Sequence, residues 1–218
     1  MLDFAQFRAC IFDFDGVLVD SEPVHAEAKA LTLEQYQLQC PPGSVQAFVG
    51  RPDSAYFEWL AEQMTLPVSI ATLLEEKHRF YQALWDEVAL IDGSLHAVRA
   101  LRQRYGKLGL VTSSTRHDVD LIAGKYLLRP WFDVIVTRDD CTQHKPDPAP
   151  YLQALSQLQL PGQQVLVIED TPNGVKAAKG AGCQVLGLTT SFDAEVLVQA
   201  GADACLENYQ QLQTWLAA

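Results

Sequence analysis

The sequence predicts an α/β fold, a doubly wound parallel sheet into which a helical domain is inserted. Three observations support this prediction. Apolar runs of strand type end repeatedly in polar residues, and from residue 91 onward such runs alternate with helical segments. The first strand is also separated from the second by far more chain than a crossover needs. Alternation of this kind is typical of a parallel sheet with helices on both faces.

The first predicted strand ends in two aspartates. The run Ile11-Phe12 is apolar, and Asp13 and Asp15 stand two positions apart at its end. Residues i and i+2 share one face of a strand, so the two carboxylates can converge. Gly16 follows at once and lets the backbone leave the strand in a conformation that is costly for other residues.

A block of helical segments follows the first strand. Apolar residues recur at helical spacing in three stretches, 24–38, the residues after Asp53, and 70–89. A β-α-β crossover needs about 30 residues or slightly more, so roughly 65–70 residues are extra. We therefore predict a cap domain, residues 19–88, inserted into a core formed by residues 1–18 and 89–218. Its place after the first strand suits a lid over the carboxyl end of that strand.

The rest of the chain alternates between helix and strand. The predicted elements are a helix at 94–105, strands at 107–112 and 134–137, a helix after Pro148, a strand at 165–168, a helix from Thr171, and strands at 184–189 and 202–206. Gly106 and Gly182 close two of these helices. Thr171 and Pro172 supply the N-cap and the first residue of another.

Composition limits what the chain can bind and where it works. Its 218 residues carry a formal net charge of -11, which argues against nucleic acid or an anionic membrane as a partner. Residues 1–8 lack the basic-then-apolar pattern of a signal peptide, and no apolar run is long enough to span a bilayer. The five cysteines are scattered, without a C-x-x-C pair. We expect reduced thiols, no zinc site and a cytoplasmic protein.

Further polar residues fall at the edge of the sheet where a doubly wound fold places its site. They are Thr112 and Ser113 after the second strand, Lys145 in a turn before a helix, and Glu169 and Asp170 at the end of the fourth strand. Together with the two aspartates of the first strand, these residue types suit phosphoryl transfer. One carboxylate can attack phosphorus, a second can act as acid and base, and Mg²⁺ binds carboxylate and phosphate oxygens. A lysine and a hydroxyl can hold the phosphate.

These segments resemble the haloacid dehalogenase (HAD) superfamily, in particular its branch of β-phosphoglucomutase-like and phosphoglycolate phosphatase-like proteins. The resemblance covers almost the whole chain and rests on four motifs in order: D-F-D-G-V-L-V-D-S, the T-S segment, K-P-D-P, and V-I-E-D-T-P-N-G-V-x-A-A-x-x-A-G. It implies a Rossmann-like core of the HAD fold, a mobile helical cap and Mg²⁺ as cofactor. The dehalogenases that named the superfamily lack an aspartate at the position of Asp15, so the resemblance implies a phosphatase or a mutase.

The same resemblance implies a role for each site residue. The catalytic residues are Asp13 as the nucleophile, Asp15 as the acid/base, and Lys145 as the partner of the nucleophile and the phosphate, while Thr112 and Ser113 bind phosphate. The metal ligands are Asp13, the backbone carbonyl of Asp15, and Asp170, with Glu169 either a further ligand or a partner of the ligands.

Two cap residues are further candidates for substrate binding. His25 matches in position a histidine of β-phosphoglucomutase that assists the acid/base aspartate, although a helix-face histidine is the simpler interpretation. Arg51 suits a second anionic group of the substrate, although exposed arginines are common. β-Phosphoglucomutase has a lysine where this chain has Val49, which favours hydrolysis over a mutase reaction.

We therefore expect a monomeric, Mg²⁺-dependent phosphoric monoester hydrolase. Its substrate would be a small phosphorylated metabolite, such as a sugar phosphate, and its intermediate an aspartyl phosphate. A β-phosphoglucomutase-like phosphosugar mutase is the alternative. A signalling receiver domain is disfavoured because its acidic pair precedes the phosphorylated aspartate and because it lacks a helical insertion of this size. A catalytically silent phosphate-binding protein is disfavoured because every catalytic position is filled.

Overall fold

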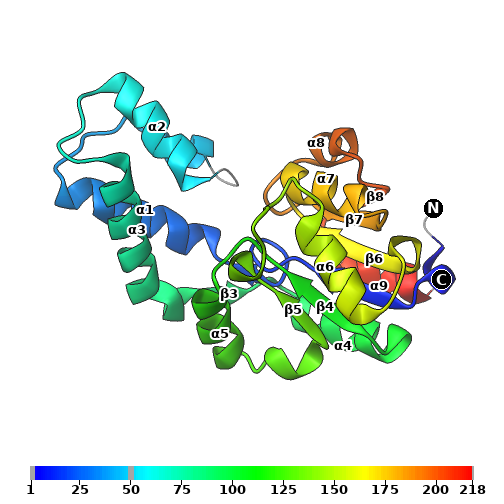
Figure 1. Cartoon of the computed structure of the whole chain (residues 1–218). Coiled ribbons are helices and arrows are strands. Elements are labelled where there is room, and N and C mark those ends of the chain that lie inside the picture. The colour runs from blue at the N-terminus through cyan, green and yellow to red at the C-terminus, as the bar shows by residue number, and fades with distance from the viewer. Residues whose placement is uncertain (1–2, 49–51, 218) are drawn as a thin grey trace. The chain divides into compact units, whose positions relative to one another are not determined.

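The computed structural model describes residues 3–48 and 52–217, in two compact units (Figure 1). The larger unit comprises the chain up to Asp20 and from Ala89 onward, and the smaller unit comprises Ser21–Val88. Each unit has an apolar core of its own. The chain therefore forms one discontinuous unit and one continuous unit inserted into it.

The larger unit is built on a parallel sheet with the order β5-β4-β1-β6-β7-β8. Its strands are β1 (Ala9–Phe12), β4 (Leu108–Val111), β5 (Val134–Val136), β6 (Val165–Glu169), β7 (Gln184–Leu188) and β8 (Ala204–Leu206). The chain order reverses between β1 and β6, which is the switch point of a doubly wound sheet and the place where such a sheet opens a crevice. The predicted α/β, Rossmann-like fold is confirmed.

Helices cover both faces of this sheet (Figure 1). They are α4 (Ser94–Tyr105), α5 (Arg116–Lys125), α6 (Ala149–Leu158), α7 (Pro172–Gly180), α8 (Ala194–Ala200) and α9 (Tyr209–Ala217). Alternate residues of β1 serve the two faces, and Ala9 and Ile11 join the core formed with α6, α7 and α8. Cys10 and Phe12 point to the opposite face, and all four side chains are fully buried. A strand buried on both faces appears in the sequence as a continuous apolar run.

Local signals in the sequence account for several helix ends. The side chain of Thr171 accepts a hydrogen bond from the amide of Gly174 at 3.1 Å, so it caps α7 as predicted. Gly106 ends α4 with a φ of 74°. Helices α5, α8 and α9 are not among the elements predicted from the sequence. For α5 a signal was present, because the side chain of Thr115 caps the helix through the amide of Asp118 at 3.2 Å.

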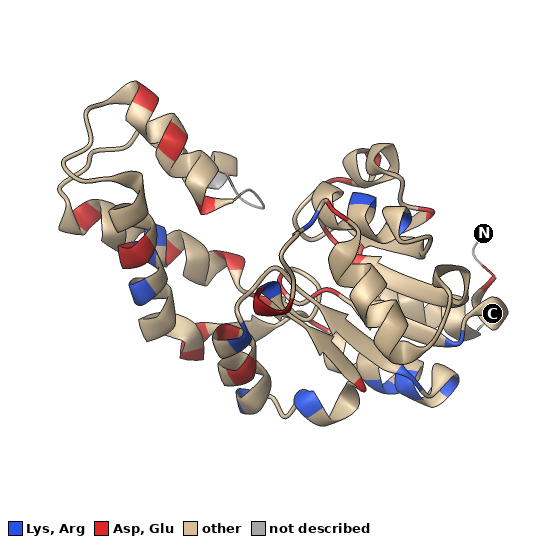
Figure 2. Cartoon of the chain, viewed as in Figure 1, with Lys and Arg blue, Asp and Glu red and all other residues tan. Residues whose placement is uncertain are grey.

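The described residues also bear on charge, thiols and membranes. Acidic residues are spread over helices of both units and do not form a single tract (Figure 2). The five cysteines are all free thiols. Among the helices that the structure describes, none combines the length and the apolar character that crossing a bilayer requires.

Two short strands lie where the chain leaves and re-enters the larger unit. β2 (Val19–Asp20) pairs antiparallel with β3 (Ala89–Leu90), and the carbonyl of Leu18 accepts a hydrogen bond from the amide of Ile91 at 3.0 Å. Residues 19 and 20, predicted to lie in the insertion, thus pair within the larger unit, and the helix predicted to reach residue 89 ends at Leu84. Strands of two residues are too short to show the alternation from which strands are predicted.

Among its described residues, the smaller unit contains three α-helices, α1 (Glu22–Gln35), α2 (Asp53–Gln63) and α3 (Ile70–Leu84). They coincide with the three stretches of helical periodicity in the sequence. α3 packs against both α1 and α2. The buried core between them is formed by Leu33, Tyr56, Phe57, Leu60 and Leu73.

A buried group of charged side chains joins these three helices. The carboxylate of Asp53 lies 3.3 Å from Nζ of Lys29 in α1 and 2.7 Å from Nζ of Lys77 in α3. Nζ of Lys77 also lies 2.5 Å from Nδ1 of His25, whose ring stacks on that of Tyr81 with centroids 4.2 Å apart. His25 thus connects α1 to Lys77 and Tyr81 of α3.

One carboxylate thus serves two buried ammonium groups. Burial raises the pKa of Asp53, but the charges of Lys77 and then Lys29 outweigh burial, so the pKa is lowered. Burial lowers the pKa of Lys77, and the charge of Asp53 only partly opposes this. Removing the shared carboxylate would deprive both buried ammonium groups of the carboxylate that lies nearest to them.

We predict that Asp53→Asn lowers the free energy of unfolding by about 3 kcal/mol at pH 7, because it removes one partner of a buried ion pair. Urea denaturation followed by circular dichroism measures this. Glu76→Gln is the control, since Glu76 pairs with Arg79 at the protein surface, and its loss should be much smaller. Equal losses in the two variants would contradict the importance of the buried group.

The same variants give a pH test. Because the folded pKa of Asp53 is lowered, its contribution to stability is present above the unfolded pKa of about 4 and is lost as pH falls through the folded pKa. The difference in stability between the wild-type protein and Asp53→Asn should therefore shrink as pH is lowered from 7 toward 3. A difference that does not change with pH would show that the carboxylate charge is not the cause.

Candidate active site

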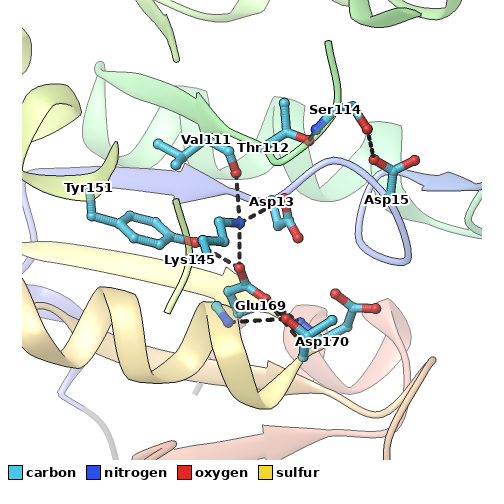
Figure 3. A network of polar contacts seen from close by, with 11 residues as sticks. Asp13, Asp15, Val111, Thr112, Ser114, Lys145, Tyr151, Glu169 and Asp170 are labelled. Atoms are coloured by element: carbon cyan, nitrogen blue, oxygen red, sulfur yellow. Dashed lines mark hydrogen bonds and ion pairs between the residues drawn. The ribbon is translucent and has the colours of Figure 1, made fainter. Parts of the chain in front are cut away.

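Acidic side chains meet at the switch point, where β1 and β6 end side by side. Asp13 follows β1 directly, and its amide donates to the carbonyl of Ile168 in β6 at 3.0 Å. Glu169 is the last residue of β6, and Asp170 follows it. Asp13, Glu169 and Asp170 are buried, and one carboxylate oxygen of each lies within 4.8 Å of the others (Figure 3). The sheet topology brings these residues together from distant parts of the chain.

Lys145 connects the ends of three strands. Its side chain is 5% exposed, and its Nζ lies 3.0 Å from Oδ1 of Asp13 and 2.6 Å from Oε1 of Glu169. Nζ also donates to the carbonyl of Val111, the last residue of β4, at 3.1 Å (Figure 3). Burial lowers the pKa of Lys145, but the charges of Asp13 and Glu169 raise it by more. The ammonium group therefore stays charged at the centre of the site.

Both carboxylate oxygens of Glu169 accept several hydrogen bonds. Oε1 accepts hydrogen bonds from Lys145 and, at 2.8 Å, from the hydroxyl of Tyr151 in α6. Oε2 accepts from the amide of Asp170 at 3.1 Å and from the amide and the hydroxyl of Thr171 at 3.2 Å each. The sequence left open whether Glu169 is a metal ligand or a partner of the ligands. Five donors on its two oxygens favour the second role.

Asp13 and Asp170, in contrast, each have a carboxylate oxygen that accepts no hydrogen bond from the described residues. Oδ1 of Asp170 is buried without a hydrogen-bond partner among the described residues, and Oδ1 of Asp13 has an ion contact with Lys145 but no hydrogen bond. Burial and then the charge of Glu169 raise the pKa of Asp13 to about 8, against the effect of Lys145. The same two causes raise the pKa of Asp170 well above its usual value. A divalent cation would balance three carboxylates that share one ammonium group.

Two glycines allow the backbone to approach these carboxylates. Gly16 has a φ of +71°, and a Cβ built on it would lie 1.9 Å from Oδ2 of Asp170. A Cβ built on Gly174, in α7, would lie 1.7 Å from Oε1 of Glu169. The sequence indicates only a conformational role for Gly16, and the structure adds a steric one. Any side chain at either position would displace a carboxylate of the site.

Asp15 lies apart from the carboxylate cluster. Its Oδ2 accepts a hydrogen bond from Oγ of Ser114 at 2.5 Å, and the amide of Ser114 donates to Oγ1 of Thr112 at 3.0 Å (Figure 3). Thr112 is buried and Ser113 is exposed. The segment after β4 is thus tied to the loop after β1 through Ser114, which the sequence analysis did not single out. Phosphate binding by Thr112 and Ser113 stays a prediction.

The two predicted cap residues have different outcomes. His25 belongs to the smaller unit, where it contacts Lys77 and Tyr81. Arg51 lies outside the described residues, as does Val49. A role of His25 or Arg51 in substrate binding stays a prediction.

Three further hydroxyl groups reach the site, and the sequence analysis missed them. Oγ of Ser191 donates to Oδ2 of Asp170 at 2.5 Å, and Oγ1 of Thr190 donates to the carbonyl of Gly16 at 2.5 Å. Both residues follow β7, at the same edge of the sheet as the other site residues, so an inspection of every strand end would have found them. The third hydroxyl is that of Tyr151, which lies inside α6 and has no local sequence signal.

Comparisons with known proteins agree with this geometry. The family model described as haloacid dehalogenase-like hydrolase matches residues 10–188. The validoxylamine A 7'-phosphate phosphatase of Streptomyces hygroscopicus subsp. limoneus is 34% identical over 198 residues, covering 89% of this chain and 91% of the relative. The phosphorylated carbohydrates phosphatase of Thermotoga maritima is 33% identical over 206 residues, covering 92% of this chain and 94% of the relative.

A solved structure extends the similarity to three dimensions. The crystal structure of a Thermotoga maritima protein with a provisional β-phosphoglucomutase assignment has a TM-score of 0.82 and 29% sequence identity, covering 97% of this chain and 100% of that one. The family match and the matching fold confirm the resemblance seen in the four sequence motifs. This chain belongs to the haloacid dehalogenase-like hydrolase family.

Proposed function

We propose that this protein is a Mg²⁺-dependent phosphatase that hydrolyses a small phosphomonoester by way of a phosphoryl group carried on Asp13. The observation that carries the proposal is the buried cluster at the switch point, where Lys145 joins Asp13 to Glu169. Asp170 lies in the same cluster. Burying several carboxylates around one ammonium group costs stability, and such groups gather where a ligand or a reaction uses them.

The donor set fits Mg²⁺, which prefers carboxylate and carbonyl oxygens. Asp13 and Asp170 offer buried Oδ1 atoms that accept no hydrogen bond from the described residues. We assign these two side chains and the backbone carbonyl of Asp15 as ligands, and Glu169 as the residue that holds Lys145. When bound, the ion neutralises phosphate charge and favours the ionised form of the attacking carboxylate.

The chain's own residues divide the chemistry between them. The carboxylate of Asp13 attacks phosphorus, the bond from phosphorus to the ester oxygen breaks, and the phosphoryl group passes to Asp13. Asp15 gives a proton to the leaving oxygen and later takes one from the water that attacks the aspartyl phosphate. That second step releases phosphate and restores Asp13. Lys145 and the backbone around Thr112 and Ser113 hold the phosphate oxygens.

We propose carbohydrate-like phosphates as the substrate class. Two relatives, 34% and 33% identical to this chain, act, by their names, on validoxylamine A 7'-phosphate and on phosphorylated carbohydrates. A phosphosugar mutase is the second candidate, and the solved structure with a β-phosphoglucomutase assignment favours it. Both reactions begin with phosphoryl transfer to Asp13 and differ in whether water or a sugar hydroxyl accepts the group. A monomeric and cytoplasmic enzyme remains the prediction from the sequence.

We predict Mg²⁺-dependent phosphate release from part of a panel of sugar phosphates, phosphoglycolate and nucleotides. A colorimetric phosphate assay measures this, with conversion of β-glucose 1-phosphate to glucose 6-phosphate followed in parallel. Release from sugar phosphates is the expected result. Conversion without release would establish the mutase, and inertness toward every ester would contradict both candidates.

Asp13→Asn should lower kcat by more than about 10⁴-fold, because an amide cannot replace the carboxylate as nucleophile. The variant should remain folded, since burial already disfavours the ionised form of this carboxyl group and an amide of the same shape replaces it. In the wild-type protein, EDTA should abolish turnover and Mg²⁺ should restore it. Substantial activity of Asp13→Asn would refute the nucleophile, and turnover that persists in EDTA would refute the metal requirement.

Gly16→Ala should abolish phosphate release, whereas Gly106→Ala should preserve it. The two glycines have φ values of +71° and +74°, so alanine costs about 1–2 kcal/mol of backbone strain at either position. Only at Gly16 does the new Cβ meet Asp170, 1.9 Å away, while nothing lies within 4 Å at Gly106. Activity assays together with thermal unfolding separate the two effects. Parallel losses of activity in both variants would show that strain alone is responsible.

A further inference from the structure

The loop after β7 reaches the site with two adjacent hydroxyl groups that the proposed chemistry does not use. Ser191 donates to Oδ2 of Asp170 at 2.5 Å. Thr190 donates to the carbonyl of Gly16 at 2.5 Å. One residue therefore holds a carboxylate at the end of β6, and its neighbour holds the loop that leaves β1.

The bond from Ser191 distinguishes the two oxygens of Asp170. Oδ2 has a donor, whereas Oδ1 is buried and has no hydrogen-bond partner within the described part of the chain. A carboxylate with one oxygen fixed by a hydroxyl cannot rotate freely, so its other oxygen keeps one direction. Partners of this kind orient metal ligands and typically change metal affinity by 10–100-fold when they are removed.

Gly16 is packed into the same contact. A Cβ built on it would lie 1.9 Å from Oδ2 of Asp170 and 2.9 Å from Oγ of Ser191. The backbone of the β1 loop, the carboxylate and the serine hydroxyl therefore touch one another, and Thr190 fastens the carbonyl of that same glycine. A shift of the β7 loop would move the β1 loop and Asp170 together.

The β7 loop is itself anchored to the sheet. The amide and the hydroxyl of Thr189 both donate to the carbonyl of Leu206 in β8, at 2.9 Å and 3.2 Å. Three consecutive residues with hydroxyl groups thus make different contacts. Thr189 donates to the neighbouring strand β8, whereas Thr190 and Ser191 donate to residues of the site. The loop is held in place by groups that do not belong to the site.

We propose that Ser191 and Thr190 are positioning residues for the divalent cation, Ser191 through the carboxylate of Asp170 and Thr190 through the loop that carries Asp15. This inference rests on the proposed Mg²⁺ site, which lies at the ends of β1 and β6, and it adds the end of β7 to that site. It assigns to the β7 loop the function of setting metal affinity, whichever phosphomonoester is the substrate.

Isothermal titration calorimetry with MgCl₂ alone, without substrate, tests this inference. Ser191→Ala should weaken Mg²⁺ binding at least about tenfold, and Thr190→Val should weaken it several-fold. Thr189→Val is the matched control, because it removes a hydroxyl of the same loop that donates to Leu206 and not to a site residue. Its affinity for Mg²⁺ should equal that of the wild-type protein. Thermal unfolding of the metal-free variants shows that each remains folded.

The outcomes separate this inference from the proposed function. If the wild-type protein binds Mg²⁺ and folded Ser191→Ala binds it equally well, the positioning role is refuted while the metal site stands. An equal loss of affinity in Thr189→Val would also refute the inference, because general loosening of the loop would then be the cause. If the wild-type protein binds no Mg²⁺, the proposed metal site fails, and this inference fails with it.

Discussion

The ion pair between Lys145 and Glu169 holds together the parts of the molecule on which the chemistry depends. Its two charged atoms are 2.6 Å apart, in side chains that are 5% and 0% exposed. A buried ion pair adds stability only when the remaining donors and acceptors are satisfied. Here the ammonium group donates hydrogen bonds to Glu169 and to the carbonyl of Val111, and its charge lies 3.0 Å from Oδ1 of Asp13. Glu169 in turn accepts hydrogen bonds from α6 and from the start of α7.

Because Lys145 and Glu169 satisfy each other, Asp13 and Asp170 are the buried carboxylates of the site that lack a full counter-charge. Their raised pKa values follow from burial beside Glu169, whose own oxygens are saturated. A sequence selected for stability alone would remove such carboxylates, and departures from local consistency are expected where function requires them. The same carboxylates would favour the binding of a divalent cation, and the cation together with Lys145 would in turn attract an anionic phosphate ester.

The site residues that stand at strand ends could be predicted from the sequence. Asp13, Lys145 and Asp170 each stand at the end of an apolar run or in a turn beside one, and the sheet topology brings them together. Tyr151 could not be predicted as a site residue, because its partner Glu169 comes from a distant strand. The pairing of Asp53 with two lysines of the smaller unit was equally hidden, since Lys77 stands on an otherwise apolar helix face. Contacts of that kind depend on helix packing, which spacing along the chain does not reveal.

The most direct test of the central claim is detection of the phosphoryl group on Asp13. Asp15→Asn would be mixed with p-nitrophenyl phosphate and Mg²⁺, quenched in acid and digested for mass spectrometry. The nitrophenolate leaves without a proton, so the first step can proceed while the second, which needs Asp15 as base, is slowed. The account predicts one phosphoryl group on the peptide that contains Asp13, and none after the further change Asp13→Asn. Phosphate release by Asp15→Asn with Asp13 never modified, or a phosphoryl group on another residue, would contradict it.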